Sequence, residues 1–271
     1  MVSLLIPHVN PQVNGEVLKL RLTENLRVVA LGDSSVFGVG DTCTEVAEKY
    51  LGWAGRFSHD LGANKYVNLG KNGARFRTLV RSQLNGALAM KPHIALICIG
   101  TNDVLRGNFS PSEIEICATN IISALRKLGT TVVFVGIPDP VKTAPGPMSL
   151  RKILQRRVRL VNWITEEVVT AKGGIYISTW NHDMAYNRNM WHVDHMHPSS
   201  LGHQEIADLV RRNLGLPRKS ENRLGVQKAA DKKFEIYWLL TSGLKWFAKR
   251  SIDLIPGMIW LIVSEKWGRR F

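Results

Sequence analysis

The stretch Arg27-Val28-Val29-Ala30-Leu31, followed at once by Gly32-Asp33-Ser34, decides the fold class of this chain. Its apolar residues run without interruption instead of alternating with polar ones. That pattern is typical of a strand that is buried on both faces of a parallel sheet. A glycine and two polar residues directly after the strand indicate a turn at the carboxyl edge of the sheet.

Four more short apolar runs follow the first, and stretches with helical periodicity separate them. The runs predict strands over residues 65–69, 93–99, 131–137 and 174–178, and the periodicity predicts helices over residues 45–61, 76–90, 111–128 and 149–171 and after residues 199–200. The third helix has a clear start, because Ser110 can cap it, Pro111 suits its first position and Glu113 completes a capping box. Strands that alternate with helices predict an α/β fold whose sheet is covered on both faces.

Length and composition predict one compact domain with short additions at both ends. The chain has 271 residues and is 45% hydrophobic, which suits a large single core over residues 27–216. Residues 1–26 form a leading segment, residues 217–233 a basic linker, and residues 234–271 an apolar, aromatic and basic tail that we expect to be helical. Three cysteines give no disulfide framework. The first residues lack the basic start of a signal peptide, so we expect the cytoplasm.

The charge of the chain is concentrated near its end. The formal net charge is +14, and residues 217–271 hold 12 Lys and Arg against 5 Asp and Glu. This asymmetry indicates an anionic surface as a partner of the tail. The most apolar stretch of the tail, residues 252–263, is shorter than the ~20 residues that cross a membrane. Peripheral membrane contact and packing against the domain both stay open for residues 234–271, whereas nothing resembles a nucleic-acid-binding fold.

Polar residues and glycines follow the predicted strands at the edge where α/β sheets bind their ligands. Ser34 follows the first strand, Gly70 the second and Asn102 the third, while Asp194 and His197 precede the last helix. Because ligands of open α/β sheets bind outside the carboxyl ends of the strands, we expect these residues to lie together.

These residues are the parts that acyl transfer needs. The hydroxyl of Ser34 is a weak nucleophile and needs a base, which His197 can supply. Asp194 lies three residues earlier and can fix the tautomer of that imidazole. The oxyanion of a tetrahedral intermediate needs hydrogen-bond donors, and the candidates are the N–H groups of Ser34 and Gly70 and the side-chain amide of Asn102.

The histidines near residue 195 leave two alternatives. His192, His195 and His197 could form a metal site with Asp194, but their spacing does not place all three on one face of a helix or strand, and no cysteine joins them. His195 also competes with His197 as the base, although the helix start directly after His197 favours the latter. We predict neither a metal nor a cofactor.

The polar blocks, taken in order, resemble the SGNH (GDSL-type) hydrolase superfamily, which includes bacterial esterases and lipases. The matching blocks are Gly32-Asp33-Ser34 with Gly38, Asn68 and Gly70 with Gly73, Gly100-Thr101-Asn102-Asp103, and Asp194 to Pro198 as Asp-x-x-His-Pro. The resemblance implies a flavodoxin-like, three-layer α/β/α fold with a five-stranded parallel sheet and metal-free ester hydrolysis. It implies Ser34 as nucleophile, His197 as base, Asp194 as its partner, and Gly70 and Asn102 as oxyanion donors, which join the Ser34 N–H in the expected oxyanion hole. Ser35 stands where the family usually has leucine.

We therefore expect a serine hydrolase that cleaves small-molecule or lipid acyl esters through an acyl-serine intermediate. One alternative is an acyltransferase that moves the acyl group to a sugar or glycerol hydroxyl, since the same triad serves both reactions. A second alternative is a non-catalytic module that binds a membrane surface or a carbohydrate. The intact set of Ser34, His197 and Asp194 argues against this last alternative.

Overall fold

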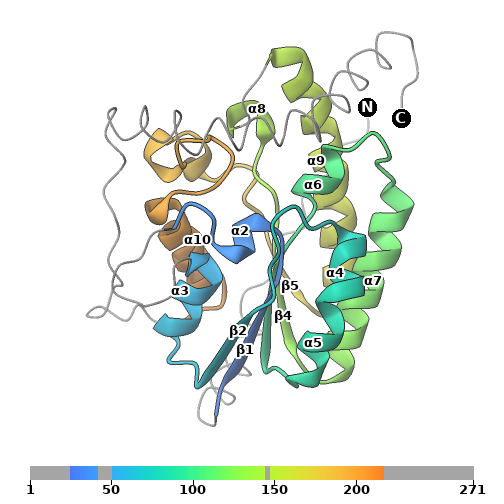
Figure 1. The fold of residues 1–271 in the computed structure, drawn as a ribbon, viewed down its shortest axis with the longest axis vertical. Coiled ribbons are helices and arrows are strands. Elements are labelled where there is room, and N and C mark those ends of the chain that lie inside the picture. The colour runs from blue at the N-terminus through green and yellow to red at the C-terminus, as the bar shows by residue number, and fades with distance from the viewer. Residues whose placement is uncertain (1–24, 42–50, 144–146, 217–271) are drawn as a thin grey trace.

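A five-stranded parallel sheet in the order β2-β1-β3-β4-β5 forms the centre of the molecule in a computed structural model of the chain (Figure 1). The structure describes residues 25–41, 51–143 and 147–216. The strands are β1 (Arg27–Gly32), β2 (Lys65–Asn68), β3 (Ile94–Cys98), β4 (Thr131–Val135) and β5 (Ile175–Ile177). All five predicted strands are confirmed. The order is that of flavodoxin-like folds, whose connections reverse direction between β1 and β3.

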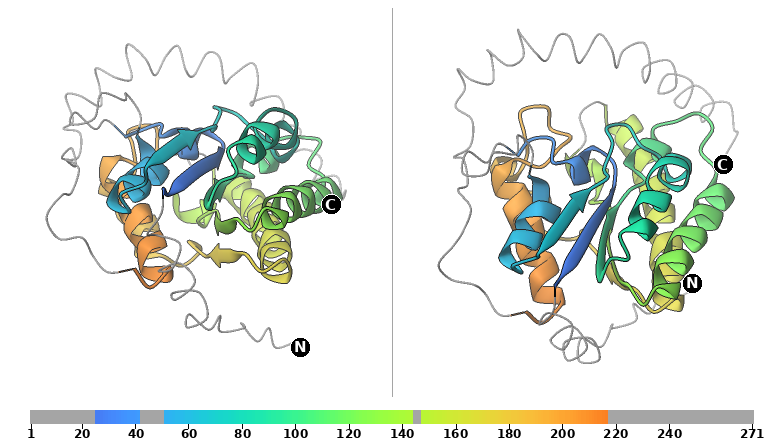
Figure 2. Two further views of the ribbon diagram at one scale, coloured as in Figure 1. Left: turned by 90° about the horizontal axis from the view of Figure 1, so that it is seen from below. Right: turned by 60° about the horizontal axis from the view of Figure 1, so that its bottom comes forward.

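Helices cover both faces of this sheet, which confirms the three-layer architecture (Figures 1 and 2). One face carries α3 (Gly52–Asp60) and α10 (Ser200–Asn213), and the other carries α4 (Phe76–Ser82), α5 (Leu84–Ala89), α7 (Pro111–Lys127) and α9 (Met148–Ala171). Short helices follow the strands: α2 (Ser34–Phe37), α6 (Thr101–Val104), α8 (Pro140–Thr143), and the 3-10 turns Asp183–Ala185 and Arg188–Met190.

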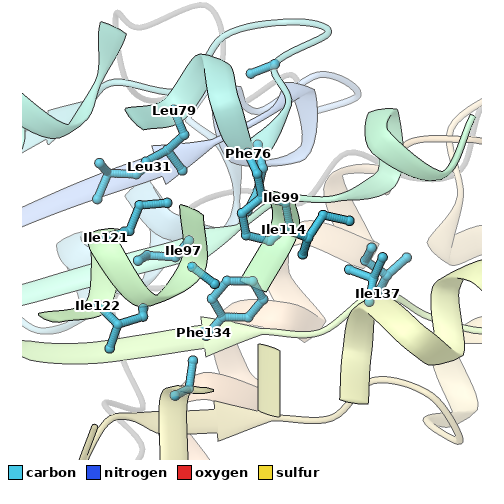
Figure 3. Close-up of a cluster of buried hydrophobic side chains, with 14 of the residues drawn as sticks. Leu31, Phe76, Leu79, Ile97, Ile99, Ile114, Ile121, Ile122, Phe134 and Ile137 are labelled. Carbon is cyan, nitrogen blue, oxygen red and sulfur yellow. The ribbon is translucent and has the colours of Figure 1, made fainter. Parts of the chain in front are cut away.

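Successive residues of the strands enter two different hydrophobic cores. In β1, Val29 and Leu31 belong to the core beneath α4, α5, α7 and α9, while Val28 and Ala30 belong to the core beneath α3 and α10. Figure 3 shows the first of these cores, which includes Leu31 of β1 and Leu79 of α4. Because each side chain from Val28 to Leu31 is removed from water on one face or the other, each of these positions favours an apolar residue. This double burial explains the uninterrupted apolar run.

The helix predicted over residues 76–90 is wrong as a single element, because it is divided at Gln83. The Gln83 side chain is buried and holds both backbone groups of Gly32. Its Oε1 accepts from the Gly32 N–H at 2.8 Å, and its Nε2 donates to the Gly32 carbonyl at 2.9 Å. Gly32 lies so close to β3 that an added Cβ would be 2.0 Å from the Cys98 carbonyl oxygen. Gln83 therefore satisfies polar groups at the crowded end of β1.

The start of α7 is capped as the sequence predicts, but only one half of the capping box is formed. Ser110 Oγ accepts a hydrogen bond from the Glu113 N–H at 3.3 Å. The Glu113 carboxylate forms an ion pair with Arg77 of α4 instead of turning back to the cap. The reason is tertiary packing, since α4 and α7 lie side by side (Figure 1).

Several predicted segments lie outside the described residues. They are residues 45–50 of the helix predicted over 45–61, the leading segment 1–26 except its last two residues, the linker 217–233 and the tail 234–271. These assignments stay predictions. Within residues 25–41, 51–143 and 147–216, no helix combines the length and the apolar character needed to span a membrane.

Candidate active site

Ser34 begins α2 directly after β1, at the point where the connections of the sheet reverse direction. Asp33 caps this short helix, and its Oδ1 accepts from the Ser35 N–H at 3.0 Å. Gly38 ends the helix in the left-handed region, with φ of 99°. The turn therefore holds Ser34 at the carboxyl edge by a capped start and a glycine end.

The Asp33 carboxyl group is buried directly below the turn. Burial raises its pKa to about 6, although the hydrogen bond from Ser35 and the charge of His197 act in the opposite direction. Loss of water from around the carboxylate is the dominant cause. Asp33 thus positions α2 and carries an acid group that titrates close to neutrality.

Ser34, His197 and Asp194 form a continuous chain of hydrogen bonds. Ser34 Oγ lies 2.8 Å from His197 Nε2, and His197 Nδ1 lies 2.7 Å from Asp194 Oδ2. Ser34 and His197 are 163 residues apart in the sequence. In this arrangement the imidazole can take the proton of the hydroxyl while the carboxylate orients the ring.

Asp194 also organises the loop that carries His197. Its Oδ1 accepts from the N–H groups of Met196 at 2.9 Å and His197 at 3.0 Å. His192 Nδ1 lies 3.3 Å from Asp194 Oδ2. Burial favours a raised pKa for Asp194, but the hydrogen bonds and charges of His192 and His197 outweigh it and hold the pKa well below its usual range. The carboxylate is therefore ionised throughout the neutral range.

His195 lies in the turn of the same loop, with φ of 55°, and its N–H donates to the His192 carbonyl at 2.9 Å. The imidazole in contact with Ser34 Oγ is that of His197. Among the described residues, no group of three His, Cys, Asp or Glu side chains is arranged to hold a metal ion.

The loops after β1 and β2 meet at Gly70. A Cβ at this position would be 2.8 Å from the Phe37 nitrogen of α2 and 3.2 Å from the Asp33 carbonyl oxygen. The Gly70 N–H donates to Asn68 Oδ1 at 2.9 Å, and Asn68 Nδ2 donates to the Val36 carbonyl at 2.8 Å. Gly70 thus lies beside α2, and its N–H donates to the Asn68 side chain.

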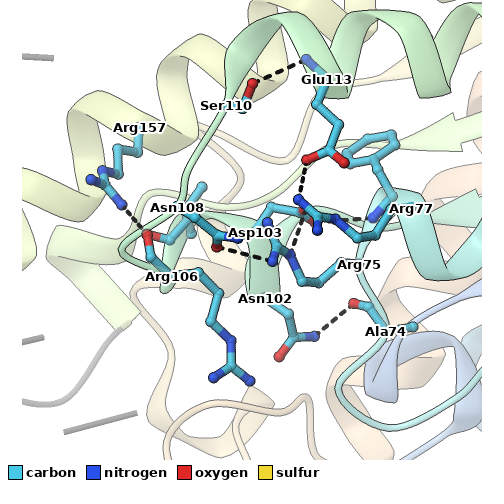
Figure 4. Close-up of polar contacts among 12 residues, drawn as sticks. Ala74, Arg75, Arg77, Asn102, Asp103, Arg106, Asn108, Ser110, Glu113 and Arg157 are labelled. Atoms are coloured by element: carbon cyan, nitrogen blue, oxygen red, sulfur yellow. Dashed lines mark hydrogen bonds and ion pairs between the residues drawn. The ribbon is translucent and has the colours of Figure 1, made fainter. Parts of the chain in front are cut away.

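Asn102 lies in α6, after β3, which is the neighbour of β1. It is buried, and its Nδ2 donates to the Ala74 carbonyl at 3.1 Å (Figure 4). The second hydrogen of that amide remains for another acceptor. Asp103 beside it accepts from Arg75 Nε at 3.1 Å and from the Phe76 N–H at 3.2 Å. These contacts hold α6 against the start of α4.

The chain matches the model of the GDSL-like Lipase/Acylhydrolase family over residues 30–205. This chain belongs to that family. Membership makes it an ester-hydrolysing enzyme of the SGNH type, in agreement with the resemblance of the sequence blocks. None of the curated proteins with which the chain was compared matches it.

Solved structures of other hydrolases share the fold of this GDSL-like hydrolase. An acetylxylan esterase from Geobacillus stearothermophilus, Axe2, is 16% identical with a TM-score of 0.58, and the match covers 72% of this chain and 97% of that chain. TesA is 21% identical with a TM-score of 0.54, and the match covers 69% and 97%. LAE5, an alpha/beta hydrolase from the metagenome of Lake Arreo in Spain, is 18% identical with a TM-score of 0.56, over 70% and 95%.

Sequence reasoning missed several polar residues that support the site of this GDSL-like hydrolase. Arg157 of α9 is buried, and its Nη1 donates to the carbonyls of Val104 at 3.0 Å and Arg106 at 2.8 Å (Figure 4). Arg157 thereby anchors the end of α6. Arg56 of α3 is also buried. The available signal was a charged residue within the apolar face of a predicted helix, because such a position requires a buried partner.

Proposed function

We propose that this enzyme cleaves carboxylic acyl esters through an acyl-serine intermediate, with Ser34 as nucleophile, His197 as general base and Asp194 as its partner. The observation that carries the proposal is the 2.8 Å contact between Ser34 Oγ and His197 Nε2, continued to Asp194 by a 2.7 Å contact. A nucleophile within hydrogen-bond reach of a base, which a third group orients, is the arrangement that activates a serine hydroxyl.

In the first step, Ser34 Oγ attacks the ester carbonyl carbon while its proton passes to His197 Nε2. The tetrahedral oxyanion accepts hydrogen bonds from the Ser34 N–H, which as the first N–H of α2 has no intrahelical acceptor, and from the free amide hydrogen of Asn102. The Gly70 N–H joins them when it turns from Asn68 to the oxyanion. The intermediate collapses, the C–O bond breaks, and His197 returns the proton to the leaving alcohol.

In the second step, His197 takes a proton from water, whose oxygen attacks the acyl carbon. The new tetrahedral intermediate releases the carboxylic acid, and Ser34 Oγ recovers its proton from His197. Water is the acceptor in this proposal. Product analysis with and without glycerol separates hydrolysis from acyl transfer, because a transferase yields the glycerol ester in place of the free acid.

The test of the nucleophile is Ser34→Ala. Since the hydroxyl forms the covalent bond, we expect kcat for a chromogenic short-chain ester to fall about 1,000-fold or more. We also expect a fluorophosphonate probe to label the native protein and not the variant. The matched control is Ser35→Ala, which removes the neighbouring hydroxyl and keeps that of Ser34. Undiminished turnover by Ser34→Ala would refute the mechanism, and an unlabelled native protein would favour a non-catalytic binding module.

The proposed substrate is a small-molecule or lipid acyl ester. The cytoplasmic location of the protein stays a prediction. Hydrolysis of esters of increasing chain length, with and without anionic liposomes, tests both the acyl pocket and the proposed membrane contact of residues 234–271. Co-sedimentation of the full chain with the liposomes supports that contact. Absence of co-sedimentation favours packing of the tail against the domain.

A further inference from the structure

A fully buried ion pair joins α3 to the segment that follows α2. Arg56 and Asp41 both have side chains with 0% exposure. Arg56 Nη2 lies 2.7 Å from Asp41 Oδ1, and Arg56 Nε lies 2.8 Å from Asp41 Oδ2. The two parallel contacts form the planar, bidentate geometry that arginine makes with carboxylates.

The same pair reaches the first turns of α10. Arg56 Nη2 donates to Ser200 Oγ at 2.9 Å, and Arg56 Nη1 donates to Gln204 Oε1 at 3.1 Å. Asp41 Oδ2 also accepts from the Gly52 N–H at the start of α3, at 3.1 Å. The ion pair therefore connects the segment after α2, the helix α3 and the helix α10.

His203 of α10 adds a second connection among the same segments. Its Nε2 donates to the Val39 carbonyl at 2.9 Å, and its Nδ1 accepts from the Trp53 N–H at 3.1 Å. Burial lowers its pKa to about 4, against the charge of Asp41, so the ring is neutral at neutral pH. We call Asp41, Arg56, Ser200, His203 and Gln204 the buried polar clamp.

The segments that the clamp joins are those that carry the two reacting side chains. Val39 and Asp41 follow the helix that begins with Ser34, and Ser200 begins the helix three residues after His197. Between them the backbones touch, because a Cβ at Gly40 would be 2.1 Å from the Pro198 carbonyl oxygen. The relative position of these two backbones determines how far Ser34 is from His197.

The cost of burying charges indicates what the clamp contributes. Removing two ions from water costs several kcal/mol each, and well-packed apolar residues often replace a buried ion pair without loss of stability. What apolar residues lack is directional geometry. Several hydrogen bonds of fixed length hold three segments in one relative position, which side-chain packing specifies less sharply.

We propose that the buried polar clamp sets the Ser34–His197 distance, and that Arg56 is a positioning residue acting through the loops of the nucleophile and the base. The inference rests on the acyl-serine mechanism proposed above. A displacement of about 1 Å of a reacting group can cost about 100-fold in rate. Loss of the clamp therefore lowers the rate of attack by Ser34 more than it changes substrate binding.

The experiment removes the ion pair without leaving a buried charge. The double variant Asp41→Asn/Arg56→Met keeps an oxygen for the Gly52 N–H and replaces the guanidinium by an apolar chain. The matched control is Asp208→Asn/Arg211→Met, which removes another buried Arg–Asp pair, with side chains 6% exposed, that lies further along α10. Both variants are compared with the native protein for Tm, kcat, KM and the rate of fluorophosphonate labelling.

We expect the clamp variant to lose about 10- to 100-fold in kcat and in labelling rate, with KM within about threefold. The control should keep both rates within about twofold of the native values, even if its Tm falls as far as that of the clamp variant. Equal loss of Tm with unchanged kcat in both variants would overturn the inference and leave a purely structural role. If the double variant does not fold, Gln204→Met takes its place, since it removes one contact of Arg56. We expect this variant to lower kcat and the labelling rate about three- to tenfold. Unchanged rates would overturn the inference.

Failure of this inference is distinguishable from failure of the proposed function. A native protein that is labelled at Ser34, together with a clamp variant of native activity, refutes only the positioning role. A native protein that neither reacts with the probe nor hydrolyses esters refutes the acyl-serine mechanism, and the positioning role with it.

Discussion

Asp194 uses its two carboxylate oxygens for different purposes. Oδ1 accepts hydrogen bonds from the backbone N–H groups of Met196 and His197, and Oδ2 lies 2.7 Å from the ring nitrogen Nδ1 of His197. The substitution Asp194→Asn keeps an oxygen for the backbone contacts but places an amide where the ring donates its proton. Because the imidazole is then held in the wrong tautomer, we expect kcat to fall by about 10,000-fold, the effect of the same change in a serine protease.

The measurement is kcat for a soluble ester, with thermal unfolding to verify that the variant is folded. Asp183→Asn is the matched control, since Asp183 is an exposed acid in the same segment between β5 and α10. We expect the control to retain native kcat. A loss of less than tenfold in Asp194→Asn would contradict the role of Asp194 as the partner of the base.

At the level of elements, the start of α7 is capped by the side chain of Ser110. Ser110 Oγ accepts from the Glu113 N–H, which has no intrahelical acceptor. We expect Ser110→Ala to lower the free energy of unfolding by about 1 kcal/mol, measured by urea denaturation, and to leave kcat within about twofold. The control is Glu115→Gln, an exposed position in the same helix. Equal stability of Ser110→Ala and the native protein would contradict the capping role.

The strands and long helices could be predicted from the sequence because their signal is local. A run such as Val28 to Leu31 shows its burial without reference to any other segment, and Ser110 with Pro111 marks a helix start. The break at Gln83 could not be predicted in this way. The Gln83 side chain contacts Gly32, which is 51 residues away in the sequence. Four-residue helices such as α2 and α6 are too short to show a helical period.

Three of the candidate site residues, Ser34, Gly70 and Asn102, could be predicted because they follow strands in recognisable blocks, and a parallel sheet gathers such residues at one edge. Ser34 and Asn102 belong to this class. The residues that hold the site together, such as Arg56, do not follow strands in such blocks. Arg56 lies between Trp53 and Phe57 on a buried helix face, and its partner Gln204 is 148 residues away. Only the folded arrangement identifies such a partner.

For the molecule as a whole, two buried titratable groups make opposite contributions to stability in acid. The pKa of Asp33 is about 6 in the folded state, above its ordinary 3.8, so the folded state binds a proton first and stability from this group rises as pH falls from 6 to 3.8. The pKa of His203 is about 4, below its ordinary 6.5, so the unfolded state binds a proton first. Stability from this group is therefore lost as pH falls from 6.5 to 4. Each contribution is on the order of 3 kcal/mol, and the two have opposite signs.

His203→Gln should therefore reveal the loss that His203 causes. The amide can accept from the Trp53 N–H and donate to the Val39 carbonyl, as the neutral imidazole does, but it does not titrate. Relative to the native protein, we expect the variant to gain up to about 3 kcal/mol between pH 7 and pH 4, measured as the difference between urea unfolding curves at the two pH values. His59→Gln is the control, because that ring is 48% exposed and remains in contact with water in both states. Parallel pH dependence of the native protein and His203→Gln would contradict the burial of a neutral histidine between α10 and α3.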